Sequence, residues 1–181
     1  DRNRIALQSD ILGAAALGIR NVLALTGDHS SLGDHPQAKP VFDLDSVQLT
    51  AMLRKMVDEK KDFAGNKLNA APEMHIGVAL SPGLSPLEPE IIKLEKKIKA
   101  GAEFAQTQVV YDVKVMERLR EAIAHLDIPV LVGIAPLKSL GMAKFMAKNV
   151  PGVAVPKEIM EKLENSKNIK ETTVEITAAL L

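Results

Sequence analysis

The chain has 181 residues, of which 46% are hydrophobic and 25% charged, and its 23 basic side chains balance its 23 acidic ones. This composition predicts one globular domain, residues 1–181, with a substantial core. Zero net charge argues against nucleic-acid binding, and with four Phe, one Tyr and no Trp there are few rings for base stacking. The absence of cysteine excludes disulfides, thiolate metal sites and a cysteine nucleophile.

The sequence lacks the features of a membrane or secreted protein. No apolar stretch reaches about 18 residues, and the charged start Asp1-Arg2-Asn3-Arg4 is unlike a secretory signal. We therefore expect a cytoplasmic protein that does not bind membranes. A start at Asp1 rather than Met is what a processed or excised piece would show.

Segments with helical spacing of apolar residues alternate with strand-like runs along the chain. The first predicted helix covers residues 5–17 and ends at Gly18, a residue type that commonly follows a helix C-terminus. The second begins at a cap formed by Asp45 or Ser46. The apolar stripes of the second, third and fourth helices are, in turn, Val47, Leu53, Met56 and Val57; Leu87, Ile91, Leu94 and Ile98; and Val113, Met116, Leu119, Ile123 and Leu126.

Four short runs of nearly continuous apolar residues predict strands that are buried on both faces, as in a parallel sheet. They cover residues 22–25, 76–80, 104–111 and 130–134. Repeated strand and helix units imply right-handed crossovers, so the fold class is α/β, either an open doubly wound sheet or a barrel. No dinucleotide-binding or P-loop glycine pattern is present, which disfavours those two classes.

In both architectures, functional residues gather at the carboxyl ends of the strands. The polar residues at or near these ends are Asp28, Ser81, Gln108, Asp112 and Lys138. The position of Asp28, in the stretch LALTGDH, therefore favours a functional role over the simple exit of a strand into solvent.

The loop after this stretch contains residue types that bind metals. Asp28, His29, Asp34 and His35 could in principle ligate zinc or iron. However, they lie in a loop rich in Ser and Gly and lack a fixed helical spacing. Ordinary loop polarity is the favoured interpretation, and no metal site is predicted.

Lysines cluster on the third predicted helix, at Lys93, Lys96, Lys97 and Lys99. Such a cluster is usually a solvated face with acidic neighbours one turn away. Lys93 and Lys97 are four residues apart and share a helix face, so an anionic phosphate could be bound by that pair. The residues alone favour the solvated face.

Two glutamines stand out within a predicted strand, because alternation places Gln106 and Gln108 on the same face. A buried amide needs partners for its donors and its acceptor, and near a strand end it often contacts a polar ligand. A structural hydrogen bond to a neighbouring strand explains the glutamines equally well. Both interpretations stay open.

Three motifs in order along the chain resemble the methylenetetrahydrofolate reductase family. They are DRNRIALQSDILGAAALGIRNVLALTGD, KAGAEFAQTQVVYD and GIAPLKS followed by MAKFMAKNVPGVAVP. The resemblance implies a (β/α)8 TIM barrel, here incomplete, with about four parallel strands and without the first strands and the last one. If these 181 residues are the whole chain, the incomplete barrel exposes two sheet edges, and we then expect a homo-oligomer or a partner subunit to cover them.

The resemblance also implies an activity. It is the flavin-dependent reduction of 5,10-methylenetetrahydrofolate to 5-methyltetrahydrofolate, with NAD(P)H as electron donor and FAD, or FMN, as cofactor. The family's general acid, a glutamate on its first strand, has no counterpart in these residues. The alternative is a non-catalytic fragment or subunit that binds flavin or folate within a larger complex. A Schiff-base lyase on the same type of barrel would need a lysine inside a strand, and the four runs contain none.

Residue roles follow from the matching motifs. Asp28, in the TGD turn, corresponds to the family's pterin-binding and flavin-tuning aspartate, and Gln108, in the TQ pair, to its folate-binding glutamine. These two are the implied catalytic residues and are expected to meet at one mouth of the barrel. Phe145 is implied to pack near the folate.

The implied flavin contacts come from three segments of the chain. Thr26 and Gly27 would line the flavin beside Asp28, although the family often has an arginine where Thr26 stands. Ser81 occupies the place of an aromatic flavin contact found in some members. The residues implied to hold the ribityl and diphosphate groups are Glu90, Lys93, Lys96 and Lys97.

Overall fold

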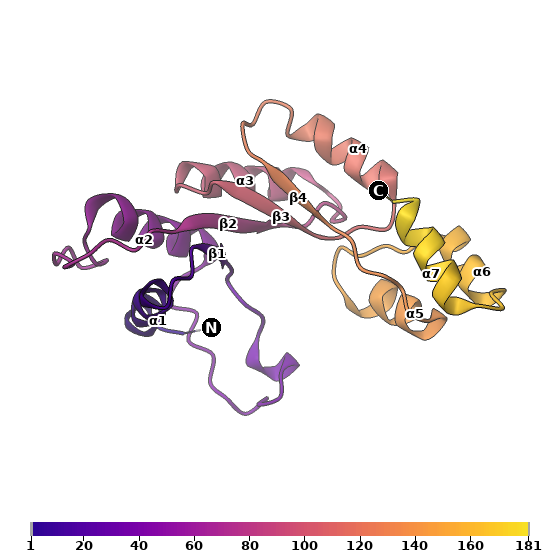
Figure 1. Cartoon of the computed structure of the whole chain (residues 1–181), viewed down its shortest axis with the longest axis horizontal. Coiled ribbons are helices and arrows are strands. Elements are labelled where there is room, and N and C mark those ends of the chain that lie inside the picture. Colours follow the sequence, from indigo (N-terminus) through magenta and orange to yellow (C-terminus); the bar gives the residue numbers. More distant parts are fainter. Residues whose placement is uncertain (1, 181) are drawn as a thin grey trace. The chain divides into compact units, whose positions relative to one another are not determined.

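A computed structural model describes residues 2–180 of the chain. Helices and strands alternate from the N-terminus to β4, and three further helices follow (Figure 1). The elements are α1 (Arg4–Ala16), β1 (Asn21–Ala24), the short 3-10 helix η1 (Ser30–Leu32), α2 (Ser46–Glu59), β2 (His75–Leu80), α3 (Glu88–Lys99), β3 (Phe104–Val109), α4 (Val113–Ala122), β4 (Val130–Gly133), α5 (Leu140–Asn149), α6 (Lys157–Glu164) and α7 (Ile169–Ala178).

The four strands are parallel and follow the order β1-β2-β3-β4 in one sheet. The register of β1 and β2 pairs Asn21 with His75 and Ala24 with Val78. Helices α2, α3 and α4 connect successive strands, as parallel pairing requires. The predicted α/β class is thus confirmed, and repeated β/α units of this kind are consistent with part of a TIM barrel.

The chain divides into two compact units. Unit 1 comprises Asp1–Ala79 and Lys93–Ala105, and unit 2 comprises Leu80–Ile92 and Gln106–Leu181. The single domain expected from the sequence stays a prediction.

In unit 1, α2 supplies much of the buried surface. Its N-cap is Asp45, whose side chain accepts a hydrogen bond from the Gln48 N–H while the Gln48 side chain accepts one from the Asp45 N–H, so the predicted cap is confirmed. The core residues of this unit on α2 and β2 include Met52, Leu53, Met56, Ile76 and Val78, each fully buried. Removal of these apolar side chains from water stabilises this unit.

Glu103, directly before β3, ties together the start of β2 and the middle of α2. One carboxylate oxygen accepts a hydrogen bond from the Ile76 N–H at 2.8 Å and lies 3.2 Å from the Arg54 guanidinium. The other lies 3.4 Å from Nδ1 of His75. Burial acts to raise the pKa of Glu103, but the Ile76 N–H and the Arg54 charge outweigh it, so the pKa lies below its usual value.

This lowered pKa predicts a pH-dependent contribution to stability. A carboxyl whose folded pKa is depressed stabilises the fold above its unfolded pKa, about 4.3, and loses that contribution as the pH falls through the folded value. We expect Glu103→Gln to lower the free energy of unfolding by about 1 kcal/mol at pH 7 and by less at pH 3. Urea unfolding at the two pH values measures this. Glu59→Gln, which alters an exposed pair with Lys61, is the control and should change little; an equal loss for Glu103→Gln at both pH values would contradict the prediction.

In unit 2, the core lies between the segment that follows β3 and the last three helices. Helices α5, α6 and α7 pack consecutively against one another (Figure 1). The buried cluster contains Tyr111, Leu137, Ala143, Val153, Leu163 and Ile176. The hydroxyl of Tyr111 has no hydrogen-bond partner within the described part of the chain, and burial raises the pKa of this group.

Several details differ from the sequence-based expectation. Leu131 and Val132 of β4 are 54% and 43% exposed, so burial of all four strands on both faces is wrong. The physical reason is the sheet order, because β1 and β4 are its outermost strands within residues 2–180. The third strand ends at Val109 instead of residue 111, since Asp112 already caps α4.

No helix within residues 2–180 combines the length and the apolar character needed to cross a membrane.

Candidate functional site

The turn that follows β1 in unit 1 carries Thr26, Gly27 and Asp28. The Thr26 hydroxyl accepts a hydrogen bond from the Ser46 N–H at 3.0 Å, at the start of α2. Gly27 has φ 86°, a left-handed conformation in which other residue types are strained. The chain turns there and leaves Asp28 exposed to solvent. A carboxylate in this position can accept hydrogen bonds from a ligand.

The start of α2 is a fixed anchor for this turn. Ser46 is buried, and its carbonyl accepts a hydrogen bond from the fully buried Thr50 hydroxyl at 2.7 Å. Because the first N–H groups of a helix have no partner within the helix, the Thr26 hydroxyl satisfies one that α2 cannot satisfy itself. Thr26 therefore joins the end of β1 to α2 through its side chain.

The loop between Asp28 and α2 is held by its own polar contacts. The Ser30 hydroxyl donates to the Ala38 carbonyl at 2.6 Å. Near the end of the loop, Arg4 forms two side-chain hydrogen bonds with Asp43, at 2.7 and 2.9 Å, which lower the pKa of Asp43 to about 2. His29 and His35 are exposed, and no group of three or more histidine or acidic side chains within residues 2–180 is placed to hold a metal ion.

The lysines of α3 differ in their surroundings. Lys93 and Lys96 are exposed and take part in no salt bridge within residues 2–180. Lys97 is only 4% exposed, and its ammonium group donates to the Ala79 carbonyl at 2.7 Å, near the end of β2. Although Lys93 and Lys97 are one helical turn apart, only Lys93 presents its charge to solvent.

In unit 2, Ser81 and Glu90 are brought together as neighbours. The Ser81 N–H donates to a Glu90 carboxylate oxygen at 3.2 Å, which links the residue after β2 to the first turn of α3. Both residues are half-buried. The second oxygen of Glu90 remains a potential acceptor for a hydroxyl group.

Gln108 lies near the carboxyl end of β3. It is half-buried, and its side-chain oxygen accepts a hydrogen bond from the Val109 N–H at 2.9 Å. Gln106 is exposed, whereas its two neighbours, Ala105 and Thr107, are buried. This confirms that successive side chains of β3 alternate between its two faces, as predicted. Phe145 is on α5 and is 59% exposed. Asp28 and Gln108 belong to different units, so their meeting at one mouth stays a prediction.

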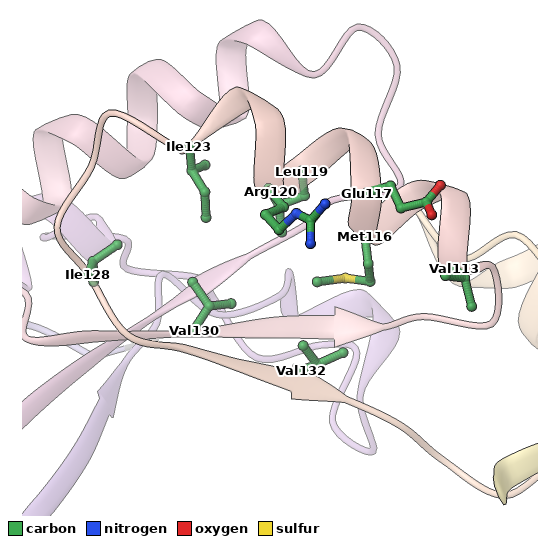
Figure 2. Close-up of a pocket in the computed structure, with 9 residues that line it drawn as sticks. All are labelled: Val113, Met116, Glu117, Leu119, Arg120, Ile123, Ile128, Val130 and Val132. Carbon is green, nitrogen blue, oxygen red and sulfur yellow. The ribbon is translucent and has the colours of Figure 1, made fainter. Parts of the chain in front are cut away.

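A further cavity in unit 2, of about 500 Å³, lies between α4 and β4 (Figure 2). Val113, Met116 and Ile123 of the α4 segment face Val130 and Val132 of β4 across it. Its lining is largely apolar, and none of the residues predicted from the sequence to bind flavin or folate contributes to it.

The repeated β/α units, with polar groups at the ends of their strands, define an α/β protein of the kind that builds TIM barrels. The family model described as "Methylenetetrahydrofolate reductase" matches residues 1–181. The chain belongs to the methylenetetrahydrofolate reductase family, which is an enzyme family with a TIM-barrel fold.

Individual relatives agree with this assignment. The chain is 32% identical to methylenetetrahydrofolate reductase 2 of Schizosaccharomyces pombe over 162 residues, which are 85% of this chain and 24% of the relative. It is 27% identical to the 5,10-methylenetetrahydrofolate reductase of Salmonella typhimurium over 86% of this chain and 47% of the relative. The chain is 28% identical to the 5,10-methylenetetrahydrofolate reductase of Escherichia coli, over 77% of this chain and 42% of the relative. The chain thus spans about a quarter to a half of the length of these relatives.

Proposed function

We propose that the chain takes part in the reduction of 5,10-methylenetetrahydrofolate to 5-methyltetrahydrofolate, with electrons from NAD(P)H and a bound flavin. The observation that carries the proposal is the match of the family along residues 1–181, together with the TGD turn that leaves Asp28 exposed after β1. A bound flavin would supply the hydride acceptor and donor that connects the two substrates. The remaining roles belong to side chains of this chain.

Asp28 and Gln108 are proposed to recognise the folate. The pterin ring carries a guanidine-like edge of N–H groups, and a carboxylate can accept paired, charge-assisted hydrogen bonds from such an edge. Asp28 is exposed and so is open to a ligand. An amide such as that of Gln108 can both donate and accept, as recognition of the pterin requires. Phe145 would add an exposed aromatic surface near the folate.

The residues proposed to hold the flavin fit its chemistry. The exposed ammonium groups of Lys93 and Lys96, which have no salt bridge within residues 2–180, suit the negative charge of a diphosphate or phosphate. Glu90 can accept from ribityl hydroxyl groups. Gly27 allows close approach of a ring because it lacks a side chain. FAD is the proposed cofactor, with FMN as the alternative.

Two other predicted flavin contacts are already engaged within unit 1. The Thr26 hydroxyl binds the start of α2, and the Lys97 ammonium binds the Ala79 carbonyl. We therefore propose that these two residues support the flavin through the backbone they hold, namely the TGD turn and the end of β2.

The experiment is a two-step spectroscopic assay of the purified protein. We expect flavin absorbance, bleaching on addition of NADH or NADPH under anaerobic conditions, and recovery of the absorbance on addition of methylenetetrahydrofolate. A colourless protein that FAD and FMN cannot reconstitute would refute the proposal.

A second candidate is a flavin- or folate-binding part that contributes to a larger assembly without turnover of its own. The chain spans about a quarter to a half of the length of the relatives it matches, so the activity of the complete enzyme and the binding activity of this part are tested separately. Bleaching of the flavin by NAD(P)H without reoxidation by methylenetetrahydrofolate would support this candidate over the first.

A further inference from the structure

The side chain of Thr107 bridges the ends of β3 and β4 within unit 2. Its hydroxyl accepts a hydrogen bond from the Gly133 N–H at 2.9 Å and donates one to the Gln108 carbonyl at 2.8 Å. Thr107 is only 5% exposed. The hydroxyl therefore stands between a donor on one strand and an acceptor on the other, and it satisfies both groups away from solvent.

Gly133 makes this bridge sterically feasible. A Cβ at this position would lie 2.7 Å from the Thr107 carbonyl oxygen and 3.3 Å from the carbonyl group of Gln108, which are backbone atoms. The close approach of the strands continues one step further, where the Val110 N–H donates to the Gly133 carbonyl at 2.9 Å. The backbone on both sides of Gln108 is thus fixed to β4.

The side chain of Gln108 is fixed in the same region. Because the Val109 N–H can only donate, the atom that accepts from it is the amide oxygen of Gln108. The amide nitrogen is then the end of the side chain that can donate to a ligand. The direction of this donor depends on the backbone of residues 108 and 109, which the Thr107 bridge holds in place.

We propose that Thr107, together with Gly133, is a positioning residue for Gln108 and sets the affinity for the folate. This inference rests on the proposed function, since it assumes that Gln108 contacts the folate. Pre-organisation of a binding group lowers the cost of ordering it on association. Loss of the bridge should therefore weaken folate binding without changing the reaction between the flavin and NAD(P)H.

The test compares three variants by calorimetric titration with 5-methyltetrahydrofolate. Thr107→Val keeps the shape of the side chain and removes both hydrogen bonds, and we expect it to raise the Kd at least fivefold. Thr107→Ser keeps the hydroxyl and should restore near wild-type affinity. Thr173→Val removes another buried hydroxyl of unit 2, which donates to the Leu137 carbonyl at 2.7 Å, and should leave the Kd unchanged.

Two further measurements separate positioning from simple destabilisation. Amide hydrogen exchange of Gly133 and Val109 should accelerate in Thr107→Val and not in Thr173→Val. In steady-state assays, Thr107→Val should raise the KM for methylenetetrahydrofolate while the rate of flavin reduction by NAD(P)H stays the same. Equal Kd values for wild type and Thr107→Val, or an equal rise in Thr173→Val, would overturn the inference alone. If the wild-type protein does not bind the folate, the proposed function fails first and the inference with it.

Discussion

Replacement of Asp28 by Asn is expected to slow the folate-dependent reoxidation of the reduced protein by about 10- to 100-fold. Reduction of the flavin by NAD(P)H should stay close to the wild-type rate. The reason is that the proposed hydrogen bonds from the pterin to the carboxylate serve only the second half of the reaction. An amide of the same shape loses the negative charge, and its nitrogen cannot accept a hydrogen bond. Stopped-flow absorbance measurements of each half-reaction give the two rates separately.

The loop itself offers a matched control. Asp34 is a second exposed carboxylate between β1 and α2, and Asp34→Asn removes the same charge at a different point. We expect both half-reactions of this variant to proceed at wild-type rates. If Asp28→Asn slows both half-reactions equally, the proposed role of the carboxylate in pterin recognition is wrong.

The local structure around Asp28 could be predicted from the sequence to a large extent. The apolar run before it and the Asp45 cap after it define the end of β1 and the start of α2, because both signals depend on neighbouring residues only. The shared face of Gln106 and Gln108 in β3 was predictable for the same reason. Local periodicity determines which residue types face the core.

Contacts between distant segments could not be predicted in this way. The spacing of Lys93 and Lys97 suggests that both side chains are exposed on the same helix face. In the structure, the Lys97 ammonium donates to the Ala79 carbonyl and the side chain is buried. The bridge from Thr107 to Gly133 connects residues 26 positions apart, and threonine in a strand gives no sign of it, since threonine is common in strands. Helices α5, α6 and α7 were also absent from the sequence-based interpretation.

Gly83 illustrates the same limit, because only the folded chain shows why glycine is present there. A Cβ at Gly83 would lie 1.9 Å from the carbonyl oxygen of Gly152 and 3.0 Å from its carbonyl carbon. Both atoms belong to the backbone and cannot move aside as a side-chain end could. In unit 2, the loop after β2 therefore lies so close to the loop after α5 that only glycine fits at position 83.

We expect Gly83→Ala to lower the free energy of unfolding by about 2–4 kcal/mol, since one of the two loops must shift its backbone. Urea unfolding at pH 7, followed by circular dichroism, measures the loss. Gly141→Ala is the control in the same unit: it adds a Cβ within α5, where the nearest atom is the Ser139 hydroxyl at 3.7 Å, and alanine there should stabilise the helix slightly. The same substitution thus has opposite effects at two positions, because helix propensity decides one and a backbone contact between loops decides the other. A change below about 0.5 kcal/mol for Gly83→Ala would show that these loops do not meet in solution as described.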